Sequence, residues 1–317
     1  MLYLKEAEIR TLITMEEAIA ATESAFVARA RQRAYDVPRQ RVRLPEASLN
    51  IMQGASLDHD VLGFKVYYVL PTGHTSLIQL IDRHSGQLEA ILEAHWLGRL
   101  RTGAATAVAV KHLGKRNARV VGMFGSGRQA VSQLQALRAV MDVAVAKVFS
   151  RDREKLQQFC TTMSAELEMD VRPAGSPREV VEGADVIVTI TRGGAPVFDG
   201  NWLESGQFIS CAGVNTLAKH EIDLTTVRRA EVVVADSRDT ARTESGDLFQ
   251  AVEAGILSWE NVIDFGDVAA GLRKGRTSET DIVLFESHGM ALQDIYCAMH
   301  VVRAARERGV GSAHYPG

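Results

Sequence analysis

The sequence predicts an α/β fold in which a parallel-sheet domain interrupts a second domain of the α+β type. Three observations lead to this prediction. Beyond residue 42, apolar residues recur at every second position with polar turns between the runs, which is typical of antiparallel strands. Between residues 120 and 236, short apolar runs alternate with helices or loops, which favours a parallel sheet. A last helical pattern, residues 290–308, is expected to return to the first domain.

The first domain is expected to start with a helix over residues 4–33, for which Thr14 is a suitable N-cap. Four runs of alternating apolar and polar residues follow, and the turn at residues 84–86 joins the last two. A helix rich in small side chains, residues 101–113, comes next. The four predicted antiparallel strands are residues 48–52, 62–69, 76–82 and 87–93.

Composition restricts the class of function. A chain of 317 residues has room for about two domains. Its net charge of −3, with both signs mixed, argues against a nucleic-acid partner. The apolar runs are too short for a membrane span and the first residues lack a signal-peptide layout, so we expect a cytoplasmic protein with no membrane partner. The three scattered cysteines fit a reducing compartment, and the nine histidines lack ligand spacing, so no bound metal is expected.

A glycine-rich turn, Gly125-Ser126-Gly127-Arg128-Gln129-Ala130, lies between an apolar run and an amphipathic helix, and a second apolar run follows at residues 143–149. In the G-x-G-x-x-A pattern of a β-α-β unit, the first glycine allows a tight turn and the second lets the backbone approach a pyrophosphate. The diphosphate then lies on free N–H groups at the helix N-terminus. We therefore predict a Rossmann-like dinucleotide-binding domain over residues 115–290, inserted between residues 1–114 and 291–317.

The residues after the second strand of this unit bear on the cofactor. NAD-dependent enzymes usually place a carboxylate at that strand end for the ribose 2′-hydroxyl, whereas NADP-dependent enzymes leave it neutral and supply an arginine. Here the position is Ser150, followed by Arg151, and Arg153 is a further candidate. Asp152 leaves NAD open, because its carboxylate also suits a ribose hydroxyl. The pattern favours NADP as the cofactor, with NAD as the alternative.

Two basic residues of the first domain are candidates for chemistry. Lys65 lies among apolar neighbours on a predicted strand, where a lysine either reaches out at an edge or is held near an anion. Burial lowers the pKa of a lysine and makes it a usable acid or base. Arg101 is expected to open the helix 101–113, where a cation opposes the helix dipole unless an anion is also bound. A substrate carboxylate is the natural anion, and a solvated surface arginine is the alternative.

Strand ends of the second domain supply further candidates, because ligands bind at the carboxyl edge of such sheets. Asn215 follows one apolar run, where it either bonds a ligand or makes a simple turn. Thr189 and Thr191 occupy the end of another run and are expected to line the nicotinamide ribose. His288 and Gly289 precede the last helix, where the glycine indicates a close backbone approach and the histidine is either structural or a cofactor contact.

These motifs together resemble the ornithine cyclodeaminase/μ-crystallin family, and the resemblance spans nearly the whole chain. It is carried by MQGASLDHDVLGFKVY (52–67), LGRLRTGAATAVAVKHL (97–113), GMFGSGRQA (122–130), the AGVNTLAKHEID region (212–223), ESGDL (244–248) and GRTSETDIVLFESHGMALQD (275–294).

The resemblance implies a homodimer whose first domain binds the substrate and joins the subunits. It implies that Lys65 lies over the reacting carbon and nitrogen and that Arg101 binds the substrate carboxylate. By its spacing to Met52, Arg39 best matches a second arginine on that carboxylate, and Arg41 remains an alternative because the loop length varies. The expected cofactor contacts are Thr102, Gly125, Ser126, Gly127, Arg128, Gln129, Ser150, Arg151, Thr189, Thr191, Val214, His288 and Gly289.

One position departs from the family pattern. Family cyclodeaminases carry an aspartate in the stretch G-x-D-x-P-G-K-x-E-L, and this chain has Asn215 there. An amide does not accept a proton as a carboxylate does, which argues against ornithine cyclisation and leaves Asn215 as a candidate for orienting the reacting groups.

The sequence therefore predicts an NAD(P)H-dependent reductase of small 2-imino acids, either cyclic, such as pyrroline-2-carboxylate, or linear. The reverse reaction is amino acid dehydrogenation. In this hypothesis a hydride passes from nicotinamide C4 to C2 of the iminium, and Lys65 supplies a proton or stabilises charge near the nitrogen. The alternatives are an ornithine cyclodeaminase with tightly bound NAD, a hydroxyproline dehydratase, and a non-catalytic crystallin-like NADP-binding protein.

Overall fold

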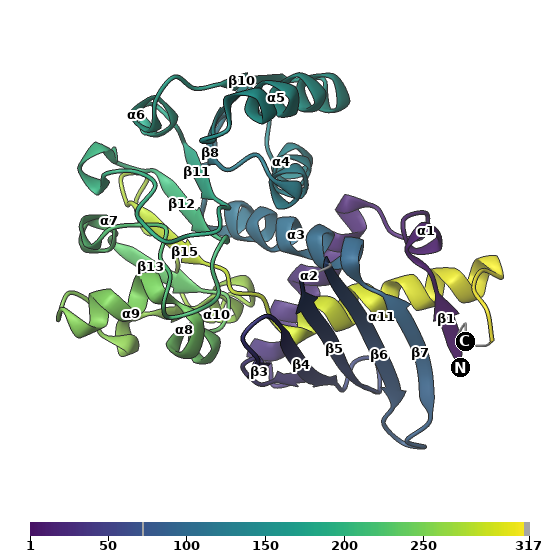
Figure 1. The fold of residues 1–317 in the computed structure, drawn as a ribbon. Coiled ribbons are helices and arrows are strands. Elements are labelled where there is room, and N and C mark those ends of the chain that lie inside the picture. The colour runs from purple at the N-terminus through teal and green to yellow at the C-terminus, as the bar shows by residue number, and fades with distance from the viewer. Residues whose placement is uncertain (72, 314–317) are drawn as a thin grey trace. The chain divides into compact units, whose positions relative to one another are not determined.

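The computed structural model describes residues 1–71 and 73–313. The chain divides into two compact units (Figure 1): unit 1 is Met1–Ala104 with Gly289–Gly317, and unit 2 is Ala105–His288. The division falls inside helix α3 (His95–Leu113), whereas the sequence places the boundary after this helix. The function that each part of the chain serves stays a prediction.

Unit 1 is built on a mixed sheet. Its described strands run in the order β1-β7-β6-β5-β4-β2, with β3 also paired to β4. β1 is parallel to β7, and every other pairing is antiparallel, as the alternating pattern predicts. The strands are β1 (Leu2–Leu4), β2 (Ala34–Asp36), β3 (Gln40–Arg43), β4 (Ser48–Ser56), β5 (Val61–Leu70), β6 (Gly73–Asp82) and β7 (Leu88–Glu93).

Helices α2 (Met15–Ala30) and α11 (Ala291–Arg308) pack together, and α11 lies against β4, β5 and β6 (Figure 1). A glycine on β5 makes room for α11, because a Cβ on Gly63 would lie 3.0 Å from the side chain of Ile295. The register of the sheet places Met52, Lys65 and Ile78 side by side on β4, β5 and β6. The long hairpins thus position Lys65 in the middle of the sheet.

Unit 2 holds a fully parallel sheet in the order β10-β9-β8-β11-β12-β15-β13-β14. β8, β11, β12 and β15 are central and almost entirely buried, which explains their continuous apolar runs. The strands are β8 (Val120–Phe124), β9 (Val145–Phe149), β10 (Asp170–Pro173), β11 (Val186–Thr189), β12 (Phe208–Cys211), β13 (Val232–Ala235), β14 (Ile263–Asp264) and β15 (Val283–Glu286).

Short helices connect these strands, and most begin at a side chain that caps the first turn, such as Asp152 or Ser176. α4 differs, since it begins at Gly127 with no side-chain cap. The helices of unit 2 are α4 (Arg128–Val140), α5 (Arg153–Leu167), α6 (Pro177–Val181), α7 (Leu224–Arg229), α8 (Arg238–Glu244), α9 (Gly246–Glu253) and α10 (Phe265–Ala269), with 3₁₀ turns η1 (Gly200–Trp202) and η2 (Trp259–Asn261).

Two predictions about helices are wrong. The segment 4–33 is not one helix: Leu2–Leu4 pairs with β7, a single turn α1 (Glu6–Ile9) follows, and α2 starts afresh after Thr14, whose hydroxyl accepts a hydrogen bond from the Glu17 amide. Arg101 does not open a helix, because α3 already begins at His95. Arg101 therefore lies in the second turn, and the helix-dipole argument for an anion there does not apply.

Candidate active site

The glycine-rich turn has the geometry that a diphosphate requires. Gly125 directly follows β8 with φ of +116°, and a Cβ at this position would lie 2.6 Å from the carbonyl oxygen of Ile190. Gly127 caps α4, and a Cβ there would meet no atom within 4 Å. The next amides, of Arg128 and Gln129, belong to the first turn of the helix, where N–H groups have no intrahelical partner.

Side chains of the same turn also present polar groups that a ligand could contact. Arg128 is exposed, and Ser126 and Gln129 are half-buried. The Oε1 atom of Gln129 is buried and lacks a hydrogen-bond partner within the described residues. The open glycine and the amides of the first helical turn fit a dinucleotide diphosphate at the start of α4, whereas the Gln129 oxygen, an acceptor, would suit a hydroxyl donor.

The end of β9 carries no free carboxylate for a ribose hydroxyl. Ser150 is half-buried and Arg151 is exposed. Asp152 caps α5 by accepting a hydrogen bond from the Lys155 amide at 3.1 Å, and it also pairs with the Lys155 ammonium. Arg153 donates to the carbonyl oxygens of residues 174 and 175, so it serves the fold at this position.

At the carboxyl end of β11, Thr189 and Thr191 direct their hydroxyls at a buried carboxyl group. Thr189 Oγ1 donates to Glu221 Oε2 at 2.9 Å, and Thr191 donates to Glu221 Oε1 through its backbone amide at 2.7 Å and through its hydroxyl. Glu221 also accepts from the amide of Gly213 at 2.8 Å. Glu221 thus ties together the loops that follow β11 and β12, a role that the sequence did not reveal.

His288 is buried just after β15, between a backbone carbonyl group and a carboxyl group. Its Nδ1 lies 3.2 Å from the carbonyl oxygen of Val214, and its Nε2 lies 3.4 Å from Glu286 Oε2. Val214 and His288 are both buried, whereas Asn215 is exposed. The backbone of the β12 loop and the imidazole are therefore held as one unit at the carboxyl edge of the sheet.

Several carboxyl groups at this edge are buried. Burial raises the pKa of Glu221 to about 7 and that of Asp247 to about 6. Burial, reinforced by the nearby charge of Asp247, also raises the pKa of Glu286 well above its ordinary value. These shifts keep part of the negative charge neutralised near pH 7, which lessens repulsion of an anionic cofactor at the edge where such sheets bind ligands.

Unit 1 contains a buried cluster of charged groups. Lys65 Nζ lies 2.7 Å from Asp294 Oδ2, and Arg101 Nε lies 3.3 Å from Asp294 Oδ1. The Nη1 atom of Arg101 donates to Gln293 Oε1 at 2.8 Å. Lys65 is 5 % exposed, Arg101 7 % and Asp294 1 %. One carboxylate therefore serves two buried basic groups, and the cluster carries a surplus positive charge whenever Lys65 is protonated.

The lysine of this cluster has an unusual proton affinity. Burial lowers the pKa of Lys65 to about 7, and the positive charge of Arg101 acts in the same direction. Asp294 opposes this shift by its charge and its hydrogen bond, and Arg39 adds a smaller lowering effect. An ammonium group with a pKa near neutrality both gives up and takes back a proton readily, which suits a general acid.

The two upstream arginines differ in their surroundings. The Arg39 guanidinium lies 5.7 Å from the centre of the Tyr67 ring, and Lys65 Nζ lies 5.8 Å from the same centre. Arg41 Nε donates to Asn50 Oδ1 at 3.2 Å. Thus Arg39 and Lys65 both lie near the Tyr67 ring, whereas Arg41 contacts Asn50 of β4.

Gly289 and Thr102 also lie in unit 1, although the sequence interpretation assigned both to the cofactor. A Cβ on Gly289, which has φ of +85°, would lie 2.6 Å from Arg101 Nη1, so this glycine makes room for the guanidinium. Thr102 Oγ1 donates to the Gly98 carbonyl at 2.7 Å within α3. Their contact with a cofactor stays a prediction.

Asp294 and Gln293 were missed as site residues by the sequence reading. Both lie in the first turn of α11, where acidic and amide side chains are common for helix stability alone. The available signal was their place in the stretch GMALQD, directly after the Ser-His-Gly segment. Asp294 Oδ2 lies 2.7 Å from a residue 229 positions earlier in the chain, a contact that only the fold reveals.

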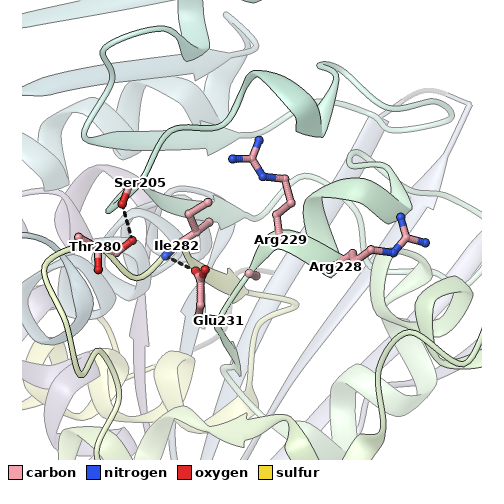
Figure 2. A pocket seen from close by; sticks show the side chains of 7 residues that line it. Ser205, Arg228, Arg229, Glu231, Thr280 and Ile282 are labelled. Atoms are coloured by element: carbon pink, nitrogen blue, oxygen red, sulfur yellow. Dashed lines mark hydrogen bonds between the residues drawn. The ribbon is translucent and has the colours of Figure 1, made fainter.

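A surface pocket of about 280 Å³ lies elsewhere in unit 2 (Figure 2). Ser205 donates there to the Thr280 carbonyl, and Glu231 accepts from the Ile282 amide. These residues directly precede β12, β13 and β15. The pocket therefore opens at the amino ends of the strands, the edge opposite the glycine-rich turn.

Comparison with known proteins assigns the family. The model of the ornithine cyclodeaminase/mu-crystallin family matches residues 1–309. The chain belongs to this family. The predicted α/β class with a Rossmann-like parallel sheet is confirmed by the structure and by related solved structures. No helix among the described residues has the length and apolar character needed to cross a membrane.

Three relatives illustrate the functions found in the family. The Thermococcus litoralis Δ1-pyrroline-2-carboxylate reductase, in a structure with NADH and L-proline, is 29% identical with a TM-score of 0.95, covering 99% of this chain and all of that one. An archaeal alanine dehydrogenase, a dimer with bound NAD, is 30% identical with a TM-score of 0.92, covering 98% of both chains. A protein of Sinorhizobium fredii named an uncharacterized cyclodeaminase is 32% identical over 326 residues, covering 98% of both chains.

Proposed function

We propose that this protein is an NAD(P)H-dependent reductase of small 2-imino acids, with amino acid dehydrogenation as the reverse reaction. The buried cluster of Lys65, Arg101 and Asp294 carries this proposal. A surplus positive charge in a buried site suits an anionic substrate, and a guanidinium matches a carboxylate. The names of the reductase and dehydrogenase relatives support the 2-imino acid class.

In the proposed reaction, Arg101 and Arg39 bind the substrate carboxylate and so fix the C2 carbon and the imine nitrogen. C2 would receive a hydride, which is the chemistry that a nicotinamide cofactor would supply when bound. Lys65 donates a proton to the nitrogen, which receives the electron pair of the C=N bond as that bond becomes single. With its pKa lowered to about 7, the lysine regains the proton from water. Orientation of bound groups supplies most of the rate in such a scheme.

For the cofactor we propose that NADP is accepted, with NAD as the alternative. Support comes from Ser150 and the exposed Arg151 at the end of β9, where a 2′-phosphate meets no free carboxylate. Gly125, Gly127 and the amides of Arg128 and Gln129 would hold the diphosphate. Thr191, Val214 and His288 would contact the nicotinamide end.

We also propose that the protein works as a cytoplasmic homodimer. The strands β2–β5 of unit 1 and the residues next to them leave large apolar side chains exposed, among them Val42 of β3 at 64 % and Leu44 directly after β3 at 67 %. Exposed apolar residues gathered on neighbouring strands are typical of a subunit interface. Three free, buried thiols fit a reducing compartment.

An ornithine cyclodeaminase is the second candidate, favoured by the name of the Sinorhizobium relative. Asn215 argues against it, because the family cyclodeaminases carry an aspartate at this position and an amide does not act as a base.

The decisive experiment follows NADPH and NADH absorbance with pyrroline-2-carboxylate, piperideine-2-carboxylate, and pyruvate with ammonia or methylamine. We expect stoichiometric cofactor oxidation with at least one of these compounds, and none in the Lys65→Met variant. A flat trace with every compound, together with ammonia release from ornithine without net cofactor oxidation, would establish the cyclodeaminase instead.

A further inference from the structure

We propose that Asp294 is the positioning residue of the proposed reaction: one carboxylate oxygen holds the Lys65 ammonium and the other holds the Arg101 guanidinium. This inference rests on the proposed function. It explains how the proton donor, Lys65, and the carboxylate-binding Arg101 are held in fixed positions relative to each other. Asp294 is not among the site residues that the sequence predicts.

The geometry makes Asp294 a shared partner of the two cations. It reaches Lys65 Nζ on β5 at 2.7 Å and Arg101 Nε on α3 at 3.3 Å, so a single carboxylate bridges two elements of unit 1. The neighbouring Gln293 accepts from Arg101 Nη1 at 2.8 Å. With Nε and Nη1 both directed at α11, the orientation of the guanidinium plane is fixed.

The backbone that carries Asp294 is itself held firmly. Asp294 lies in the first turn of α11, where a negative charge is favoured by the helix dipole. The following residue, Ile295, packs at Gly63 of β5, close along the strand to Lys65. The carboxylate is thus attached to the same helix-to-sheet contact that positions the lysine.

Stability alone gives no reason for this cluster. Burying a salt bridge removes charges from water, and the attraction between the partners often fails to offset that loss. Here two cations share one carboxylate, so charge remains uncompensated. Replacing a buried ion pair by apolar side chains of similar volume is often neutral or stabilising, so a role in binding and proton transfer is the better explanation of the cluster.

The charged and titratable groups facing Lys65 define the expected effect of removing Asp294. Arg101 on α3 and Arg39 before β3 lower the proton affinity of the lysine, Asp294 on α11 raises it, and Tyr67 on β5 presents its ring. Without the carboxylate, only the opposing influences remain. Lys65 then loses its proton at a lower pH, and Arg101 loses one of its two anchors.

The test compares Asp294→Asn with Asp36→Asn. Asp36 is a matched control in the same unit, because its side chain is 3 % exposed and lies 3.0 Å from Arg29 Nε. The first readout is the pH dependence of kcat/KM for the imino acid. The second is calorimetric binding of pyrrole-2-carboxylate, a planar carboxylate without a reducible C=N bond, in buffers of different ionisation enthalpy, which reports protons taken up on binding.

We expect Asp294→Asn to move both the alkaline fall of kcat/KM and the pH of maximal proton uptake downward by about one to three pH units. KM should also rise, because Arg101 is less well oriented. Asp36→Asn should leave both pH values unchanged. Asp294→Glu, which keeps the charge, should retain the wild-type pH profile with a raised KM, and it serves if Asp294→Asn does not fold.

Equal pH profiles for Asp294→Asn and the wild type would overturn the positioning role. An Asp294→Glu variant with the wild-type KM and an alkaline fall of kcat/KM moved to lower pH would also overturn the positioning role. The calorimetric readout needs no turnover. A shifted proton uptake in a protein that reduces none of the imino acids would therefore retain the positioning role while rejecting the proposed reaction.

Discussion

The two glycines of the turn after β8 differ in their surroundings, so replacing each by alanine should change a different property of the protein. Gly125 has φ of +116° and its missing Cβ faces the Ile190 carbonyl at 2.6 Å. Gly127 has φ of −84° and open space around its missing Cβ. We predict that Gly125→Ala destabilises the fold, whereas Gly127→Ala leaves the fold intact and weakens cofactor binding.

The structure sets the size of each effect. For Gly125→Ala, backbone strain of about 1–3 kcal/mol adds to an overlap of about 1–3 kcal/mol, a total of roughly 2–6 kcal/mol. Each kcal/mol lowers the melting temperature of a protein this large by about 2–4 °C, so a fall of roughly 4–24 °C is expected. For Gly127→Ala, a methyl group in the path of the diphosphate should weaken cofactor binding by at least about tenfold, which is about 1.4 kcal/mol.

The assay combines thermal unfolding with fluorescence titration of NADPH and NADH. Gly183→Ala is a matched control, because Gly183 has φ of +63° and no atom within 4 Å of its missing Cβ, so alanine there adds strain without overlap. Gly183→Ala should lower the melting temperature less than Gly125→Ala does. Wild-type cofactor affinity in Gly127→Ala would refute the placement of the diphosphate, and an unchanged melting temperature in Gly125→Ala would refute the geometry of the turn.

Three further predictions concern the proton donor, the cofactor and the interface. Because the ammonium form of Lys65 donates the proton and its pKa is lowered to about 7, kcat/KM should fall about tenfold per pH unit above that value. The Lys65→Met variant should have a kcat/KM lower by about 10²–10⁴-fold and should lack this alkaline fall. A wild-type kcat/KM that does not change at alkaline pH would contradict the assignment of Lys65 as the proton donor. Ser150→Asp should raise the Kd of NADPH at least about tenfold and spare NADH, and equal calorimetric affinities for NADPH in the variant and the wild type would count against a 2′-phosphate at this position. Leu44→Asp should convert the dimer to a monomer in light scattering at micromolar concentration, and an unaltered mass would place the interface elsewhere.

The fold was predictable where the local signals agree with the tertiary structure. The run 120–124 is buried on both faces and ends at a glycine turn, so period, length and turn chemistry predict the same strand. Residues 2–4 gave no such signal, since their apolar pattern continues into a helix. Their strand exists because it pairs in parallel with residues 90–92, and the sequence alone does not show this long-range contact.

The candidate site was predictable residue by residue only in part. Lys65 was recognisable as a cation among apolar neighbours, and burial of its side chain is the expected result of that pattern. Asp294 was not recognisable, because an aspartate in a first helical turn is ordinary. Arg101 was selected for a helix start that does not exist, although its grouping with Lys65 agrees with the resemblance. Side-chain partners far apart in sequence are set by packing, which no local pattern encodes.

The central claim is hydride transfer to C2 of an imino acid, and isotope transfer tests it most directly. The protein would be incubated with pyrroline-2-carboxylate and NADPH carrying deuterium at both C4 positions, and the product examined by proton NMR. We predict proline with deuterium at C2, one per cofactor oxidised. Proline without deuterium would contradict the account, and so would a parallel incubation in which ornithine gives proline and ammonia while the label stays on the cofactor.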